Sequence, residues 1–228
     1  MMKLIYCAGK NETFAQVAIR AGFKYGAQLP CAVYGPLFFA DQNWKNPNRA
    51  AYMAALAHHR PQMATVLDWE RDEQLDEILD WAEEASQYVE DILIIPKVVG
   101  GIDQLPRFIN GKRVVLAYSV PTRYAGTSVP AWELAGWPIH LLGGSPHQQI
   151  QLWRYFSCIA EVISADGNMA NKMAHQFCAF WRARKGAKGH WVRLKEVGDG
   201  DWGEGSNLEA FRRSCRNIKA RWNSLLNL

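Results

Sequence analysis

The sequence predicts an α/β fold, a compact (β/α)8 barrel of the TIM type, and three observations lead to this prediction. Short apolar runs alternate with stretches of helical periodicity, the order that produces βαβ units and a parallel sheet. About eight such runs can be counted, which is the number of strands that closes a barrel. Two of the runs end in an aspartate, Asp68 and Asp166, and barrel enzymes carry catalytic residues at such strand ends. An open doubly wound sheet is the alternative fold.

The composition favours a single domain spanning residues 1–228. Hydrophobic residues make up 49% of the chain and include ten tryptophans, enough for a substantial core. No apolar run is long enough to span a bilayer and the N-terminus turns polar too early for a signal peptide, so we expect a cytoplasmic protein without a membrane partner. Five scattered cysteines without a Cys-x-x-Cys pair indicate neither a disulfide framework nor a zinc ribbon, and we expect no metal or other cofactor.

The first part of the chain alternates strands with helices. Strands are expected at residues 3–8, 30–40 and 63–67, the second of them interrupted by Gly35-Pro36. Helices are expected at residues 13–21, from Asn46-Pro47 to about His58, and at 72–89. The last of these is clearly amphipathic, with one apolar face formed by Leu75, Ile78, Leu79, Ala82, Ala85 and Val89.

The second part continues the alternation. Further strands are expected at residues 92–95, 113–118, 139–142, 162–165 and 190–195. The helices between and after them are expected at 102–109, from Pro146 to about Cys158, at 168–184 and at 207–226. This order of elements gives the predicted barrel, closed by a basic helix.

Residues 181–228 form a basic C-terminal segment. It contains 11 Lys and Arg against 5 Asp and Glu, whereas the rest of the chain contains 15 against 17. This asymmetry suggests a polyanion partner for the segment, and the alternative is a solvated helix face. The expected nucleic-acid contacts are Arg123, Arg182, Arg184, Lys185, Arg212, Arg213, Arg216 and Lys219.

Several common enzyme motifs are missing from the sequence. No Gly-x-Gly-x-x-Gly follows the first strand, which argues against a dinucleotide site, and neither a P-loop nor His-Glu-x-x-His is present. More specific is the stretch Ile-His-Leu-Leu-Gly-Gly-Ser-Pro at 139–146, followed by a helix and by Val-Ile-Ser-Ala-Asp-Gly-Asn at 162–168. Upstream, Pro47-Asn48-Arg49-Ala50 opens a helix that leads to Val66-Leu67-Asp68-Trp69-Glu70.

These motifs resemble the tRNA-guanine transglycosylase superfamily over roughly residues 45–175. The superfamily's Cys-x-Cys-x-x-Cys…His zinc site has no counterpart here, and its Asp-Ser-Gly-Gly-Phe-Gln motif is also absent. The chain therefore looks closer to the phage and bacterial enzymes that exchange guanine in DNA for a 7-deazaguanine. The resemblance implies that DNA and a free 7-deazaguanine base, most simply 7-cyano-7-deazaguanine, are the partners.

The resemblance implies that Asp166 is the nucleophile, and Asp41 takes the place of a second catalytic acid. Base exchange at a glycosidic carbon follows the logic of a retaining glycosidase, in which an ionised carboxylate attacks C1′. The alternative is that Asp166-Gly167-Asn168 only forms a turn and a helix cap.

Asp68 is expected to read the guanine edge by accepting two hydrogen bonds, unless it only caps the next helix. Glu70 supports it or lies in the first turn of that helix. Tyr118, Ser119, His140 and Lys97 are further candidates for substrate binding, with core packing or solvation as alternatives. Gly143 and Gly144 allow close backbone approach to a ligand or simply form a turn.

Three rival functions follow from the same residues. They are a metal-free hydrolase of a nucleosidic or glycosidic bond, a tRNA-directed transglycosylase, and a non-catalytic DNA-binding barrel.

Overall fold

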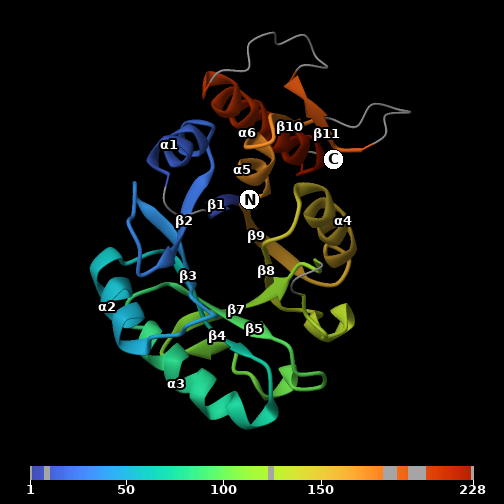
Figure 1. Cartoon of the computed structure of the whole chain (residues 1–228). Helices are drawn as coiled ribbons and strands as arrows, with labels where there is room; N and C mark the ends of the chain where they lie inside the picture. The colour runs from blue at the N-terminus through green and yellow to red at the C-terminus, as the bar shows by residue number, and fades with distance from the viewer. Residues whose placement is uncertain (1, 8–10, 123–125, 182–188, 195–203, 227–228) are drawn as a thin grey trace.

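The computed structural model describes residues 2–7, 11–122, 126–181, 189–194 and 204–226, without the side chains of 204–206 (Figure 1). Eight parallel strands form a closed barrel in which each strand pairs with the next and the last pairs with the first. They are β1 (Lys3–Cys7), β2 (Lys24–Leu29), β3 (Leu37–Gln42), β4 (Met63–Trp69), β5 (Asp91–Pro96), β7 (Lys112–Ser119), β8 (Pro138–Leu142) and β9 (Glu161–Gly167). The predicted TIM-type barrel is therefore confirmed, and the open sheet is excluded.

Helices cover the outside of the barrel, as Figure 1 shows for α2 and α3 beside β3, β4 and β5. The α-helices are α1 (Glu12–Arg20), α2 (Arg49–His59), α3 (Leu75–Ala85), α4 (Pro146–Phe156), α5 (Met169–Ala174) and α6 (Glu204–Leu226). Short 3-10 helices occupy η1 (Asp72–Gln74), η2 (Ile102–Gln104) and η3 (Ala131–Leu134). Side-chain caps start three of the α-helices, because Asn11, Asn48 and Ser145 each accept a hydrogen bond from a first-turn amide.

The core has an inner and an outer part. Inside the barrel, side chains such as Phe39, Met63 and Leu93 are almost fully buried and fill the space between the strands. A much larger apolar cluster lies between the strands and α2, α3 and α4. A third cluster joins α1, α5 and α6 to β1 and β2.

The count of eight strands was predicted correctly through two errors that cancel. The sequence prediction missed β2, because Gly26 weakens the strand pattern. In the barrel, Gly26 lies against Phe39 and Ile5, where a Cβ would be 2.9 and 3.0 Å from their side chains. The predicted strand at 190–195 is not a barrel strand, because β11 (Trp191–Arg193) pairs only with β10 (Cys178–Phe180) in an antiparallel hairpin. The predicted strand at 30–40 begins later, at Leu37.

Two predicted helices were also wrong. The helix expected over 168–184 ends at Ala174, because Phe177 adopts a left-handed φ of 55° and the chain turns into β10. Ser214 and Asn217 of α6 hydrogen-bond the backbone of Phe180, a tertiary contact that helical periodicity does not reveal. The helix expected over 102–109 is only η2 followed by β6 (Phe108–Ile109), which pairs antiparallel with the start of β7.

None of the helices in the described part of the chain combines the length and the apolar character needed to cross a membrane.

Candidate active site

A pocket of about 490 Å³ opens where the barrel strands end. Seven of the eight strands contribute to it directly or through the residues that follow them. The lining includes a set of polar side chains and turn glycines, namely Cys7, Asp41, Thr65, Asp68, Lys97, Ser119, Gly143, Gly144 and Asp166. Most of the residues predicted at the strand ends therefore line one cavity.

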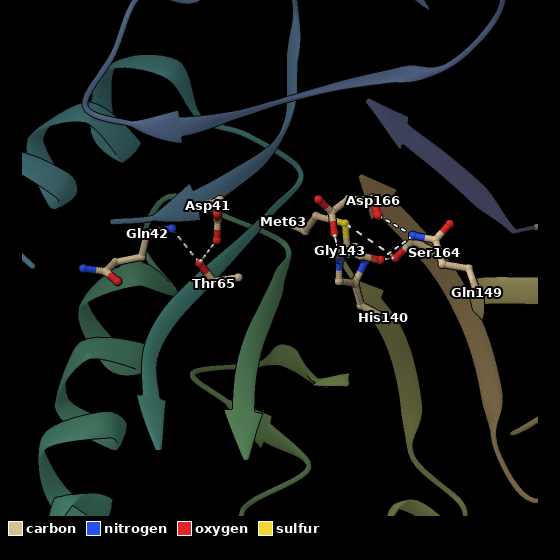
Figure 2. A network of polar contacts seen from close by, with 9 residues as sticks. All are labelled: Asp41, Gln42, Met63, Thr65, His140, Gly143, Gln149, Ser164 and Asp166. Carbon is tan, nitrogen blue, oxygen red and sulfur yellow. Dashed lines mark hydrogen bonds and ion pairs between the residues drawn. The ribbon is translucent and has the colours of Figure 1, made fainter. Parts of the chain in front are cut away.

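Asp166 lies near the end of β9, beside Ile5 of β1, and is 7% exposed. Its Oδ1 atom accepts a hydrogen bond from the Gly143 amide at 2.8 Å and lies 3.2 Å from His140 Nε2. Figure 2 shows these partners gathered around one side of the carboxylate. Within the described residues, no donor reaches Oδ2, so this oxygen is left for a ligand.

The turn after β8 holds Asp166 through its backbone. Gly143 and Gly144 have φ values of +70° and +79°, a region that favours glycine. A Cβ at Gly144 would overlap the side chain of Val120. Gln149 of α4 is buried, and its amide donates hydrogen bonds to the carbonyl oxygens of both Gly143 and Asp166. The turn therefore fixes the backbone of Asp166 and supplies one donor to its side chain.

Asp41, at the end of β3, faces the same pocket and differs from Asp166 in its surroundings. Burial, and then the nearby charge of Asp166, raise the pKa of Asp41 to about 8. A hydrogen bond from Thr65 Oγ1 at 3.2 Å opposes this shift without cancelling it. Figure 2 shows Asp41 and Thr65 as a group separate from the His140–Asp166 group. At neutral pH Asp41 is therefore mostly protonated and can donate a proton.

Cys7 ends β1 in this pocket and was not a predicted site residue. Burial, together with the charges of Asp166 and Asp41, raises the pKa of the Cys7 thiol well above its ordinary value. A thiol in this state is not a nucleophile, because the thiolate is the reactive form.

The base-reading candidate Asp68 is part of a small charged cluster. Lys97 Nζ lies 2.6 Å from Asp68 Oδ2 and 2.8 Å from Glu70 Oε1. Burial lowers the pKa of Lys97, but the bonds and charges of the two carboxylates outweigh it and raise that pKa overall. Lys97 is therefore charged and forms ion pairs with both carboxylates. Asp68 Oδ1 has no partner among the described residues.

Two predicted substrate contacts lie elsewhere. Tyr118 points out of the barrel and packs against Phe156 of α4, with ring centroids 4.9 Å apart. His140 points inward but is fully buried beneath Asp166, so it touches the carboxylate and not a ligand in the pocket. The sequence analysis assigned no binding role to the lining residues Thr65, Trp44, Asn168 and Lys172.

The basic helix α6 contributes nothing to this pocket. Arg212 and Arg213 form ion pairs with Glu209 at 2.6 and 2.8 Å, and Arg216 lies 3.8 Å from the same carboxylate. Lys219 Nζ donates to the carbonyl of Ala21. The expected contacts Arg123, Arg182, Arg184 and Lys185 lie outside the described residues.

Residues 18–223 match the model of a protein family of unknown function, DUF6610. The chain belongs to this family. No curated protein matches the chain. Within the described part of this DUF6610 protein, no group of three or more His, Cys, Asp or Glu side chains is placed to hold a metal ion.

Proposed function

We propose that this chain is a cytoplasmic DNA guanine transglycosylase that exchanges guanine for a 7-deazaguanine through a covalent aspartyl intermediate. The observation that carries the proposal is one pocket that contains Asp41, whose pKa is raised, and Asp166, whose Oδ2 receives no hydrogen bond from the described residues. Asp166 offers a free Oδ2, while the raised pKa of Asp41 keeps a proton available at neutral pH. Pairs of acids whose environments separate their proton affinities divide the roles of acid and base in this way.

In the proposed reaction Asp166 attacks C1′ of the target nucleotide and the glycosidic bond breaks. The departing guanine takes its proton from Asp41, which raises the leaving-group ability of the base. The incoming deazaguanine then attacks C1′ and returns its ring proton to Asp41 as the ester bond to Asp166 breaks. Both half-reactions use the same two side chains, as in retaining glycosidases.

Base recognition is assigned to Asp68 and its neighbours. Lys97 holds Asp68 Oδ2, which leaves Oδ1 to accept from the N–H groups of a guanine-like edge. Ser119 lines the same side of the pocket and can complete the contact. At the rim, Trp44 is 53% exposed and offers an aromatic surface for a base displaced from its stack.

The phosphate backbone is assigned to Lys172 rather than to α6. Lys172 lies on α5, lines the pocket and is exposed, and it has no carboxylate partner among the described residues. A phosphate that flanks an extruded nucleotide can therefore pair with it, whereas the α6 arginines already have acidic partners.

The direct test incubates the purified protein with duplex DNA and free 7-cyano-7-deazaguanine, followed by mass spectrometry of the digested nucleosides. We expect the modified deoxynucleoside with the wild-type protein and none with Asp166→Asn. The control is Asp91→Asn at the opposite end of the barrel, which removes a carboxylate without touching the pocket. Release of free guanine without insertion would indicate a hydrolase, and exchange confined to tRNA would indicate the tRNA-directed enzyme. Unmodified DNA that is still bound would indicate a binding protein.

A further inference from the structure

Beneath Asp166 the barrel interior contains two buried polar side chains, His140 of β8 and Ser164 of β9. They are 0% and 1% exposed, and the His140 ring packs 5.1 Å from the Phe39 ring, centroid to centroid. Buried polar groups in an apolar core are unfavourable unless they are hydrogen-bonded. Here they form a chain, because His140 Nδ1 lies 2.8 Å from Ser164 Oγ and Nε2 lies 3.2 Å from Asp166 Oδ1 (Figure 2).

With a neutral imidazole and an ionised Asp166, the proton count along this chain has one solution. An ionised carboxylate only accepts hydrogen bonds, so His140 Nε2 must carry a proton toward Asp166. In a neutral imidazole Nδ1 is then an acceptor, and the Ser164 hydroxyl donates to it. The only other acceptor in reach of that hydroxyl, among the described residues, is the thioether sulfur of Met63 at 3.9 Å, which is a weak one. Ser164 therefore fixes the imidazole tautomer that points a donor at Asp166.

We propose that His140 and Ser164 are positioning residues that select Oδ2 of Asp166 as the attacking atom. The inference rests on the proposed function. Oδ1 receives two donors, the Gly143 amide and His140 Nε2, whereas Oδ2 receives none from the described residues. Hydrogen bonds to a carboxylate oxygen engage the lone pairs that would otherwise attack, so the unengaged oxygen is the nucleophile.

The same donors act in both half-reactions. In the first, a bond forms between Oδ2 and C1′ while the glycosidic C–N bond breaks, and the electron pair of that bond leaves with the base, which takes the Asp41 proton. Oδ1 becomes the carbonyl oxygen of the ester and keeps its two hydrogen bonds. In the second, the incoming base nitrogen bonds to C1′, the Oδ2–C1′ pair returns to Asp166, and the base proton goes to Asp41. The donors on Oδ1 stabilise the carboxylate as it leaves.

The test measures formation of the covalent protein–DNA adduct in a single turnover, with no acceptor base present. Without the His140 donor in His140→Leu the Asp166 carboxylate is no longer held in one orientation, and because a misplaced attacking atom can cost about 100-fold in rate, adduct formation should slow about 10- to 100-fold. His140→Gln, which restores an N–H donor of similar reach, should recover most of that loss. The dissociation constant for DNA should not change in either variant, because His140 lies beneath the pocket.

Ser164→Ala is the gentler variant and decides the matter if His140→Leu does not fold. Its matched control is Ser214→Ala, the same substitution at another fully buried serine, which accepts a hydrogen bond from the Phe180 amide of β10 and does not line the candidate pocket. We expect slower adduct formation only for Ser164→Ala. Equal adduct rates for Ser164→Ala, Ser214→Ala and the wild type would overturn the positioning role. Absence of any adduct from the wild type would instead overturn the proposed function.

Discussion

The two ends of the barrel contain pockets of the same volume, about 490 Å³ each, that differ in how their charges are arranged. At the N-terminal end of the strands, Arg113 binds both oxygens of Asp91 at 2.8 and 3.1 Å, and Lys24 lies over the ring of Phe38. At the C-terminal end, Asp41 and Asp166 share a cavity without a cation that binds either of them in the described structure.

Because the two pockets are equal in volume, size alone does not identify the candidate site. Paired charges at the N-terminal end favour the folded state. At the C-terminal end, burial and the charge of Asp166 raise the pKa of Asp41, which is useful for chemistry and unfavourable for stability.

Replacing Asp166, the proposed nucleophile, should abolish base exchange. Asp166→Asn removes the covalent route itself, so we expect base exchange to fall by about 10⁴-fold or more. Denaturing electrophoresis should show a protein–DNA adduct for the wild type and none for the variant. Asp91→Asn at the other end should retain full exchange and lose stability instead. Exchange by Asp166→Asn at a near-normal rate would remove the contrast between the two ends.

Replacing Asp41, the proposed proton donor, should lower the activity but raise the stability at alkaline pH. Asp41→Asn should lower exchange by about 10²- to 10⁴-fold, the usual contribution of a general acid. The folded pKa of about 8 lies above the ordinary value of 3.8, so the folded state binds more protons between these limits and loses stability as pH rises through them. The variant should therefore melt at a higher temperature than the wild type near pH 8.5. A lower melting temperature of the variant near pH 8.5 would show that ionised Asp41 does not destabilise the folded protein.

The pH dependence of the wild-type reaction gives a second view of Asp41. The step that needs its proton should slow as pH rises through about 8, which a rate profile of adduct formation would reveal. The Asp41→Asn variant should lack this alkaline decline. A decline that persists in the variant would assign it to another group.

The glycine turn should be sensitive to size. Gly144→Ala should destabilise the protein by about 1–3 kcal/mol, since the new methyl group overlaps Val120, and should slow exchange by moving the Gly143 amide away from Asp166. Gly136→Ala is the matched control, because Gly136 also has a positive φ, of +74°, but nothing lies within 4 Å of its Cβ position. Melting temperatures and adduct rates of both variants distinguish the steric overlap with Val120 from the backbone strain at positive φ. Equal losses of stability and rate in the two variants would show that the positive φ alone causes the effect.

The smallest effect should come from single surface charges. Lys172→Gln should weaken DNA binding and reduce the slope of log affinity against log salt by about 0.9 for duplex DNA or about 0.7 for a single strand. Arg212→Gln should leave the slope unchanged, because Arg212 is already paired with Glu209. A change in the salt slope for Arg212→Gln but not for Lys172→Gln would indicate that DNA contacts α6 instead.

Much of the candidate site could be predicted from the residues at the strand ends. The alternation of side chains along β7 explains why the prediction for Tyr118 was wrong. In β7, Val115 and Ala117 belong to the inner core, so Ser119 lies on the inward face and Tyr118 on the outward one. Strict alternation from Val115 would have placed Tyr118 outside. Ser164 and Thr65 were missed for another reason, since a short polar residue in a buried strand has no distinctive pattern until its partner from a distant strand is known.

The closure of the barrel also has a consequence during protein synthesis. β1 is the first of the barrel strands to be made, and its partner β9 is the last. Such a distant pairing is slow to form, because the intervening chain must first be ordered. Asp166 lies on that closing strand, so a nascent chain that stops short of it has two unpaired edges, β1 and β8, and lacks Asp166. Synthesis of the last barrel strand therefore supplies the closing strand of the sheet and Asp166 together.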